Sequence, residues 1–470
     1  MSLQIYNSLT QKKEEFIPQK PAQVSLYSCG VTVYDDCHIG HARSLYIFDV
    51  IRRYLGSRGL QVRFVRNITD IDDKIINRAN ELKTDWRTLV GTYIDRYYRD
   101  LAAMGIGQAD IEPRATENIG EMIKDIQILI DKGFAYPTAS GVYFSVRKFK
   151  EYGKLSGQSV EQMLTGVRKE ADETKEDALD FALWKTSKPG EPFWPSPWGD
   201  GRPGWHIECS VMSTKYLKTD TLDIHAGGRD LIFPHHENEI AQSEALTGKP
   251  FARYWIHHGL LTINGQKMSK SLGNFVTIQE FLKKHRHPEL LKLFFLSAHY
   301  SHPIDYNEDK IIEARQALER ISILFNKMEE AFADKSIQSP ETAFKEIDEI
   351  RNKFIAAMDD DFNTPQGMAC VFDLVNLANK NIDNQAFLRS ARKLFAELLD
   401  IFSLDFSRIA SLAGGSSTSE NAIIENLIVL RNEARKNRDF KEADKLRKQL
   451  EAQGVVLEDT KDGTTWRRKL

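Results

Sequence analysis

The N-terminal part of the chain shows two alternating patterns of apolar positions. A short apolar run over 24–27 predicts a buried strand, and residues 39–57 then space apolar side chains as one face of a helix requires. The run over 61–67 predicts a second strand. A strand, a helix and a strand joined by short loops form a βαβ unit, so the pattern predicts an α/β fold with a doubly wound parallel sheet.

The pattern changes character several times farther along the chain. Short β-like runs, a charged stretch and a Pro/Trp-rich stretch over 114–203 predict an insertion, because strand-like runs return at 222–224 and 254–256. From about 310 onward the pattern is mostly helical. The predicted divisions are a split sheet domain (1–113 and 204–302), the insertion (114–203), a connecting region (303–345), a helical bundle (346–412), a Gly/Ser-rich linker (413–420) and a small α+β C-terminal domain (421–470).

Composition narrows the class of protein. A chain of 470 residues implies several domains, and no apolar run reaches the roughly 18–20 residues of a membrane span. The first twenty residues hold no apolar signal-peptide core, and four cysteines are few for this length, so we expect a reducing cytoplasm. The formal net charge of −3 argues against coating nucleic acid. Residues 431–470 nevertheless hold twelve Lys and Arg against eight Asp and Glu, which favours a local RNA contact.

The segment His38-Ile39-Gly40-His41 opens the predicted helix 39–57 directly after a strand and loop. Helix N-termini carry free N–H groups and a partial positive charge that attract phosphate. Gly40 allows a nucleotide to approach closely, and the imidazoles of His38 and His41 can donate hydrogen bonds to a triphosphate. Taken alone, the segment fits an ordinary pair of surface histidines equally well.

The segment Lys267-Met268-Ser269-Lys270-Ser271 lies in a glycine-flanked loop. The ammonium groups of Lys267 and Lys270 can neutralise the charge that develops on leaving pyrophosphate, and closure of the loop would exclude water. Taken alone, this pentapeptide favours a solvated lysine loop.

The two segments together resemble the signature motifs of class I aminoacyl-tRNA synthetases, in order and in position. The resemblance implies a Rossmann-like catalytic domain with a connective insertion. It implies that His38, Gly40 and His41 bind ATP together with Mg²⁺, and that Lys270, with Lys267, stabilises the adenylation transition state. His225, which has glycines beside it at the end of a strand, is a further candidate for ATP binding, because such a loop allows the backbone to approach the adenosine or the amino acid.

A second set of residues favours a metal site. Two cysteines, Cys29 and Cys209, stand far apart in the sequence, and His235 and Glu239 are four positions apart on a predicted helix. Two thiolates, an imidazole and a carboxylate suit zinc. The residue types alone favour two buried free cysteines beside a polar helix instead. His236 or His206 could also replace His235 as the ligand.

Three local runs, 28–34, 205–209 and 235–239, resemble the cysteinyl-tRNA synthetase family. In that family the matching residues hold one zinc ion, to which the thiolate of the substrate cysteine binds. The resemblance therefore implies zinc ligation by Cys29, Cys209, His235 and Glu239. Since a catalytic zinc site keeps an open position, the substrate must add a fifth ligand or displace a weak one, and Glu239 is the candidate for displacement. Thr69 and Trp205 match positions that line the amino-acid pocket, although a lone Trp is more often a core aromatic.

The end of the chain resembles the bacterial members of this family. The resemblance implies that 421–470 binds the anticodon, that 303–345 contacts the tRNA stem and that 346–412 forms the helical bundle. Trp466 is then a candidate for stacking on a base, with Arg467 and Arg468 on phosphates or base edges, while a Trp packed under a terminal tail is the plain alternative. The expected partners are L-cysteine, ATP and tRNA(Cys), and we expect a monomer.

Three rival functions remain to be weighed against a cysteine–tRNA ligase. A ligase that transfers activated cysteine to an amino sugar would lack an anticodon-binding domain, so residues 421–470 argue against it. A small nucleotidyltransferase with the same first motif would be far shorter and would lack the zinc set. A tRNA-binding paralogue with decayed chemistry would not keep both signature motifs intact.

Overall fold

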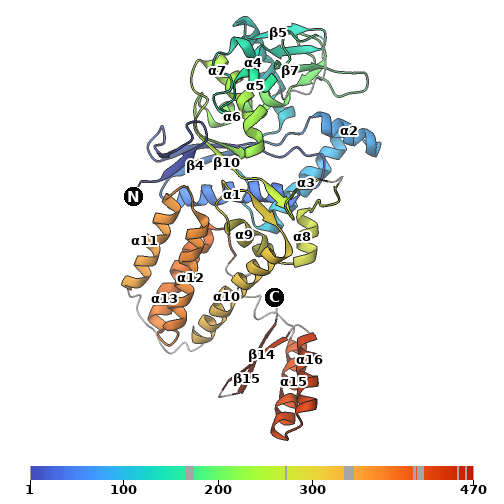
Figure 1. Cartoon of the computed structure of the whole chain (residues 1–470). Helices are drawn as coiled ribbons and strands as arrows, with labels where there is room; N and C mark the ends of the chain where they lie inside the picture. Colours follow the sequence, from blue (N-terminus) through green and yellow to red (C-terminus); the bar gives the residue numbers. More distant parts are fainter. Residues whose placement is uncertain are drawn as a thin grey trace.

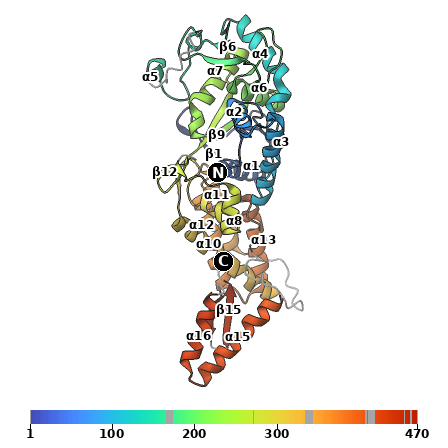
Figure 2. The same ribbon diagram turned by 90° about the vertical axis from the view of Figure 1, so that its right-hand side faces the viewer.

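The computed structural model describes residues 2–164, 174–269, 272–332, 343–405, 409, 418–452, 455–460 and 463–468. The parts follow one another along an elongated molecule (Figures 1 and 2). The insertion lies at one end, the parallel sheet and its helices come next, and a bundle of helices separates them from the C-terminal unit. None of the described helices has both the length and the apolar character needed to cross a membrane.

The central sheet confirms the predicted parallel, doubly wound architecture. Its strand order is β10-β9-β3-β4, and all neighbours are parallel. The strands are β3 (Gln23–Ser28), β4 (Gln61–Arg66), β9 (Leu222–Gly228) and β10 (Ala252–His258). Because the chain adds β4 on one side of β3 and returns to add β9 on the other, the strand order reverses beside β3. Ligands of such sheets bind at this switch point, at the carboxyl ends of the strands.

Helices cover both faces of this sheet. Val24 and Leu26 of β3 join the apolar core that contains helix α1 (Ile39–Ser57), whereas Tyr27 joins the core on the opposite face with α6 (Trp205–Leu217). The alternation follows from the period of two along a strand. Helix α7 (Glu237–Thr247) packs beside α6. The other elements of this domain are β1 (Gln4–Asn7), β2 (Lys12–Glu15), α2 (Asp73–Leu82) and α3 (Trp86–Met104).

The insertion is a four-stranded antiparallel sheet with the order β5-β6-β7-β8. Its apolar core is continuous with residues of α6 and α7, so it packs on the helices that carry predicted metal ligands. The chain passes from β8 through Gly204 into α6, and a Cβ at Gly204 would lie 1.9 Å from the carbonyl oxygen of Ala182. The elements are α4 (Ile119–Asp131), β5 (Ala135–Thr138), β6 (Gly141–Phe144), α5 (Val160–Leu164), β7 (Phe181–Thr186) and β8 (Gly201–Pro203).

A small three-stranded sheet follows the central sheet. Its strands are β11 (Leu261–Ile263), β12 (Gln266–Lys267) and β13 (Ile304–Tyr306), with α8 (Ile278–His285) and α9 (Pro288–Leu296) between the last two. The mostly helical region and the helical bundle come next, as predicted. Their helices are α10 (Glu308–Phe332), α11 (Lys345–Asp359), α12 (Thr364–Lys380) and α13 (Gln385–Ile401).

The C-terminal unit contains two helices and a hairpin. The helices are α15 (Thr418–Lys436) and α16 (Phe440–Ala452), and the tail forms antiparallel β14 (Val455–Thr460) and β15 (Gly463–Arg468). The predicted extended tail is therefore a paired hairpin.

Candidate active site

The four predicted metal ligands converge at the carboxyl edge of the central sheet. Cys29 directly follows β3, Cys209 lies on α6, His235 lies in the irregular turn η4 (Ile232–His236), and Glu239 lies on α7. Their ligand atoms all lie within 4.8 Å of one another. Cys29 is partly exposed, whereas the other three side chains are buried. The fold thus brings together residues that the sequence spreads over some 210 positions.

The atoms of this group fit a metal ion. His235 Nε2 lies 2.9 Å from Glu239 Oε1, yet it makes no hydrogen bond of acceptable geometry with any described residue. A buried nitrogen without such a bond is costly unless another partner takes its lone pair. Two sulfurs, one imidazole nitrogen and one carboxylate oxygen at this spacing are a donor set that zinc prefers.

A buried hydrogen-bond network holds the two cysteines in place. Asn67 Oδ1 accepts hydrogen bonds from the Tyr27 hydroxyl at 3.0 Å and from the backbone N–H of Gly30 at 2.8 Å, and it lies 3.7 Å from Cys209 Sγ. A Cβ at Gly30 would lie 1.5 Å from the carbonyl oxygen of Asn67, so only glycine permits this approach. Asn67 therefore ties the ends of β3 and β4 beside Cys29 and Cys209.

The charges in this group are strongly coupled. Burial raises the pKa of Cys29, as expected for an ionisable group out of water. Burial opposes ionisation of Cys209 too, but hydrogen bonding with Cys29 and the nearby His235 lower its pKa to about 6. Burial disfavours the charged form of His235, yet the charges of Glu239 and Cys209 raise its pKa to about 10. Metal binding at neutral pH must therefore displace protons from these ligands.

Further histidines surround the group. His236 Nε2 lies 3.3 Å from Cys29 Sγ, and Cys29, His225, His236 and Glu239 form a second set whose ligand atoms lie close together. His236 thus stays an alternative ligand to His235. His206 Nδ1 lies 2.8 Å from His235 Nδ1, on the side of the imidazole away from Nε2. A hydrogen bond between these two nitrogens would orient the His235 ring.

His225 lies deeper than its glycine-rich loop indicated. Its side chain is fully buried, its Nε2 lies 2.8 Å from Glu239 Oε2, and its ring stacks on Trp255 with centroids 4.4 Å apart. These contacts place the His225 side chain next to Glu239 of the candidate metal site. The predicted contact of His225 with ATP stays a prediction. Sequence reasoning missed His257, whose Nε2 lies 2.8 Å from His236 Nδ1; the pair of histidines at the end of β10 was the available signal.

Thr69 and Trp205 flank the candidate metal site. Trp205 is 38% exposed, and its ring stacks on His235 with centroids 4.1 Å apart, so it is not an ordinary core aromatic. The buried Thr69 hydroxyl donates to Glu208 Oε2 at 3.0 Å. Glu208 was not predicted, and burial raises its pKa well above the usual range. These residues form one wall beside the metal-binding side chains.

The first signature motif begins helix α1. His38 is the N-cap residue, and its Nδ1 accepts a hydrogen bond from the backbone N–H of His41 at 3.1 Å. The two rings stack with centroids 3.6 Å apart. Burial lowers the pKa of His38 to about 4, and it lowers the pKa of His41 well below the usual value. Both rings are therefore neutral at pH 7 and can each donate one N–H at a helix N-terminus.

The second motif lies directly beside the first. The backbone N–H of Ile39 donates to Val276 O at 3.0 Å, and that of Ile278 donates to Cys37 O at 2.9 Å. A Cβ at Gly40 would lie 3.2 Å from Met268 Cε. The exposed Lys267 ends β12, whereas Lys270 lies outside the described residues. The fold thus joins two motifs that stand far apart in the sequence.

The predicted RNA-binding residues lie at the far end of the molecule. Trp466 of β15 is partly buried and packs against an apolar cluster of α15, α16 and β14. The side chains of Arg467 and Arg468 lie outside the described residues.

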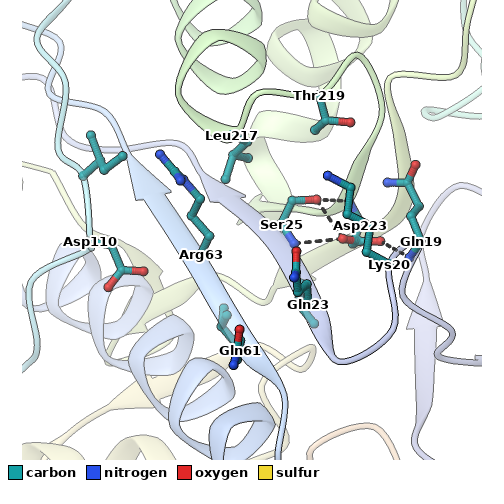
Figure 3. A pocket seen from close by; sticks show the side chains of 13 residues that line it. Gln19, Lys20, Gln23, Ser25, Gln61, Arg63, Asp110, Leu217, Thr219 and Asp223 are labelled. Atoms are coloured by element: carbon teal, nitrogen blue, oxygen red, sulfur yellow. Dashed lines mark hydrogen bonds between the residues drawn. The ribbon is translucent and has the colours of Figure 1, made fainter.

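A large cleft lies at the opposite edge of the sheet (Figure 3). It encloses about 620 Å³ and is lined by residues at the amino ends of the strands, among them Gln23 of β3 and Gln61 of β4. Within this cleft the Asp223 carboxylate accepts hydrogen bonds from the backbone N–H and hydroxyl of Ser25 and from the backbone N–H of Gln19. Because ligands of doubly wound sheets bind at the carboxyl ends, this cleft is separate from the candidate active site.

Three protein-family profiles match the chain. The tRNA synthetases class I (C) catalytic domain matches residues 15–316, the DALR domain matches residues 353–407, and the cysteinyl-tRNA ligase anticodon binding domain matches residues 420–467. The three matches follow one another along the chain and cover most of it.

Relatives and solved structures agree with these matches. A cysteine–tRNA ligase of Anoxybacillus flavithermus is 49% identical over 474 residues and covers 100% of both chains. One of Aquifex aeolicus is 48% identical over 496 residues, covering 100% of this chain and 99% of its own. Among solved structures, a Mycobacterium tuberculosis methionyl-tRNA synthetase with methionyl-adenylate aligns with a TM-score of 0.61 at 15% identity. That alignment covers 83% of this chain and 90% of the other, and at this identity it shows the fold alone.

Proposed function

The chain belongs to the cysteine–tRNA ligase family of class I aminoacyl-tRNA synthetases and has that family's activity; from this premise we propose how its residues divide the work. The observation that carries the proposal is the convergence of Cys29, Cys209, His235 and Glu239 at one edge of the sheet. The two signature motifs meet at the same helix, α1. Selection of cysteine and activation by ATP then occur in neighbouring parts of one site.

The metal-binding side chains select the substrate. When bound by Cys29, Cys209, His235 and Glu239, a zinc ion supplies a Lewis acid that takes a thiolate far more readily than a hydroxyl, which distinguishes cysteine from serine. Glu239 is the ligand that yields most easily, because its other oxygen lies 2.8 Å from His225 Nε2 and can accept a hydrogen bond from it. Trp205 and Thr69 enclose the amino acid from the side.

The signature motifs activate the carboxylate. Neutral His38 and His41 donate to the phosphates at the N-terminus of α1, with Mg²⁺ bound to ATP, and Gly40 leaves room for the nucleotide. The substrate carboxylate attacks the α-phosphate, and the bond to pyrophosphate breaks. Lys267 and Lys270 neutralise the charge on the leaving group. The 3′-terminal ribose hydroxyl of the tRNA then takes the cysteinyl group and releases AMP.

The C-terminal unit provides tRNA selection in this proposal. Trp466, Arg467 and Arg468 contact the anticodon, residues 303–345 contact the stem, and the domain divisions are those given by the sequence pattern. In this proposal the enzyme acts as a monomer, and the four proposed metal ligands come from one chain. We place the enzyme in the cytoplasm, where its tRNA, ATP and reduced cysteine occur together.

Charging of total bacterial tRNA with labelled cysteine tests the proposal, with labelled serine as the control. We expect cysteine to be attached and serine to be rejected. Cysteine-dependent ATP–pyrophosphate exchange without any charging would point to another acceptor, such as an amino sugar. Equal charging by both amino acids would refute the selection by the metal site.

A further inference from the structure

A fully buried arginine lies two residues after the first signature motif. Arg43 lies on α1 and has no exposed surface. Its guanidinium donates to four backbone carbonyls: Nη1 to Gly259 at 2.7 Å and Leu260 at 3.0 Å, and Nη2 to Tyr300 at 3.2 Å and His302 at 2.6 Å. Burial lowers its pKa to about 10, so it remains charged at neutral pH. No carboxylate of the described residues forms an ion pair with it.

The four carbonyls belong to two connections of the small sheet. Gly259 and Leu260 join β10 to β11, whereas Tyr300 and His302 lie in the connection 297–303 between α9 and β13. The connections touch one another, because the backbone N–H of Gly259 donates to Tyr300 O at 2.9 Å and a Cβ at Gly259 would lie 2.2 Å from the backbone of His302. β11 pairs with both β12 and β13. Arg43 therefore holds together the two connections that lead into β11 and β13, and β12 leads from this sheet into the second motif.

The second motif has another attachment on its far side. After the loop, the segment 276–278 forms backbone hydrogen bonds with residues 37–39, immediately before α1. The segment between β12 and this attachment therefore has one anchor at each end, and both anchors are on or beside α1. Met268 lies between them and approaches Gly40.

We propose that Arg43 is a positioning residue for adenylation, which fixes the small sheet carrying the second motif against the helix that carries the first. A buried cation without a counter-ion is costly, and an apolar residue would fill the same core volume. Only a planar guanidinium offers enough donors to hold two backbone segments at once. This inference rests on the proposed function, because it assigns Arg43 to the adenylation step of that reaction.

The test separates the two steps of the reaction in the full-length enzyme. Arg43→Met removes all donors, and Arg43→Lys keeps the charge but cannot span both connections. We expect the kcat of cysteine-dependent ATP–pyrophosphate exchange to fall about tenfold to a hundredfold in Arg43→Met, because a shift of about 1 Å in catalytic groups costs as much. Transfer from preformed cysteinyl-adenylate to tRNA should change less than about threefold, because the second motif serves the first step. Arg43→Lys should lie between wild type and Arg43→Met.

Lys292→Met is the matched control. Lys292 on α9 is equally buried and donates to the backbone carbonyl of Ser403 at 2.5 Å, on the bundle side of the domain. It should lose thermal stability without changing the ratio of the two rates. If Arg43→Met does not fold, a native unfolding temperature in Arg43→Lys with slower exchange still supports the inference. Equal loss of both steps, or unchanged exchange in a folded variant, would overturn it. Wild-type enzyme that fails to activate cysteine would instead refute the proposed function itself.

Discussion

The candidate metal-binding group and the proposed nucleotide site lie at the same edge of the sheet but are held in different ways. The four candidate metal ligands come from core elements, and all but Cys29 are buried. The proposed nucleotide site combines the start of α1 with the segment that follows the exposed Lys267 at the end of β12. The first is assembled by packing, whereas the second depends on a few backbone attachments between two elements.

This difference follows from what each part must do. In this proposal the ligands that stay on the metal when the substrate binds must keep their spacing, so they belong in a rigid core. In the proposed mechanism a lysine that neutralises leaving pyrophosphate must leave room for ATP to enter and products to leave, which suits the exposed position of Lys267 at the end of β12. Changes to the first region should therefore alter metal and substrate binding together, while changes to the second should alter only the rate.

Cys209→Ser should break the metal-binding region outright. Loss of a thiolate ligand should remove most of the bound zinc and lower cysteine-dependent ATP–pyrophosphate exchange by more than about a hundredfold, since even supporting partners of ligands contribute 10–100-fold. Metal analysis and exchange assays measure the two effects. Cys370→Ser, a buried cysteine in the helical bundle, is the matched control and should keep both zinc and activity. A zinc-free but active Cys209→Ser enzyme would show that the metal does not select the substrate.

His38→Asn should affect the nucleotide site alone. Asparagine can still cap α1, so the helix remains stable while the stacked imidazole is lost. We expect adenylate formation to slow by about a hundredfold to a thousandfold, the usual effect of removing one donor to developing charge. Zinc content and the affinity for cysteine, measured by calorimetry, should not change. Loss of zinc in this variant would mean that the two regions are not separate.

The sequence predicted the local elements of both regions better than their junctions. The strand and helix periodicities placed β3, α1 and β4 within a residue of their bounds, because each buries a continuous apolar stripe. No periodic signal in the sequence indicated the backbone hydrogen bonds between 37–39 and 276–278, or those that Arg43 donates to backbone carbonyls. Both sets depend on the positions of backbone atoms and not on a pattern of side chains. The prediction that Cys29, Cys209, His235 and Glu239 come together rested on the family resemblance, because ligands dispersed along a sequence have no diagnostic spacing.

The pH dependence of stability should report on the start of α1. Burial holds the pKa of His38 at about 4, below the unfolded value of about 6.5. The unfolded chain therefore takes up this proton first, so the stabilisation is complete above pH 6.5 and is lost as pH falls toward 4. The loss is at most about 3 kcal/mol at 1.36 kcal/mol per pKa unit. Chemical denaturation of wild type and His38→Asn between pH 7 and 4 measures it, and wild type should fall more steeply. Parallel curves would show that His38 is not shielded from water.

Substitution of Trp466 in the C-terminal unit should have the smallest effect. Trp466 packs against the apolar cluster of the C-terminal unit, and its strand β15 lies at the opposite end of the molecule from the insertion (Figure 1). Trp466→Phe keeps an apolar ring in the cluster but reduces the surface available for stacking on a base, which contributes about 1–3 kcal/mol. We expect the KM for tRNA to rise about threefold to tenfold, while cysteine-dependent ATP–pyrophosphate exchange and zinc content stay at wild-type values. Trp466→Ala additionally removes the packing, so a stability loss seen only in Ala separates the two roles. A KM unchanged in the folded Phe variant would mean that Trp466 packs under the hairpin and does not contact the anticodon.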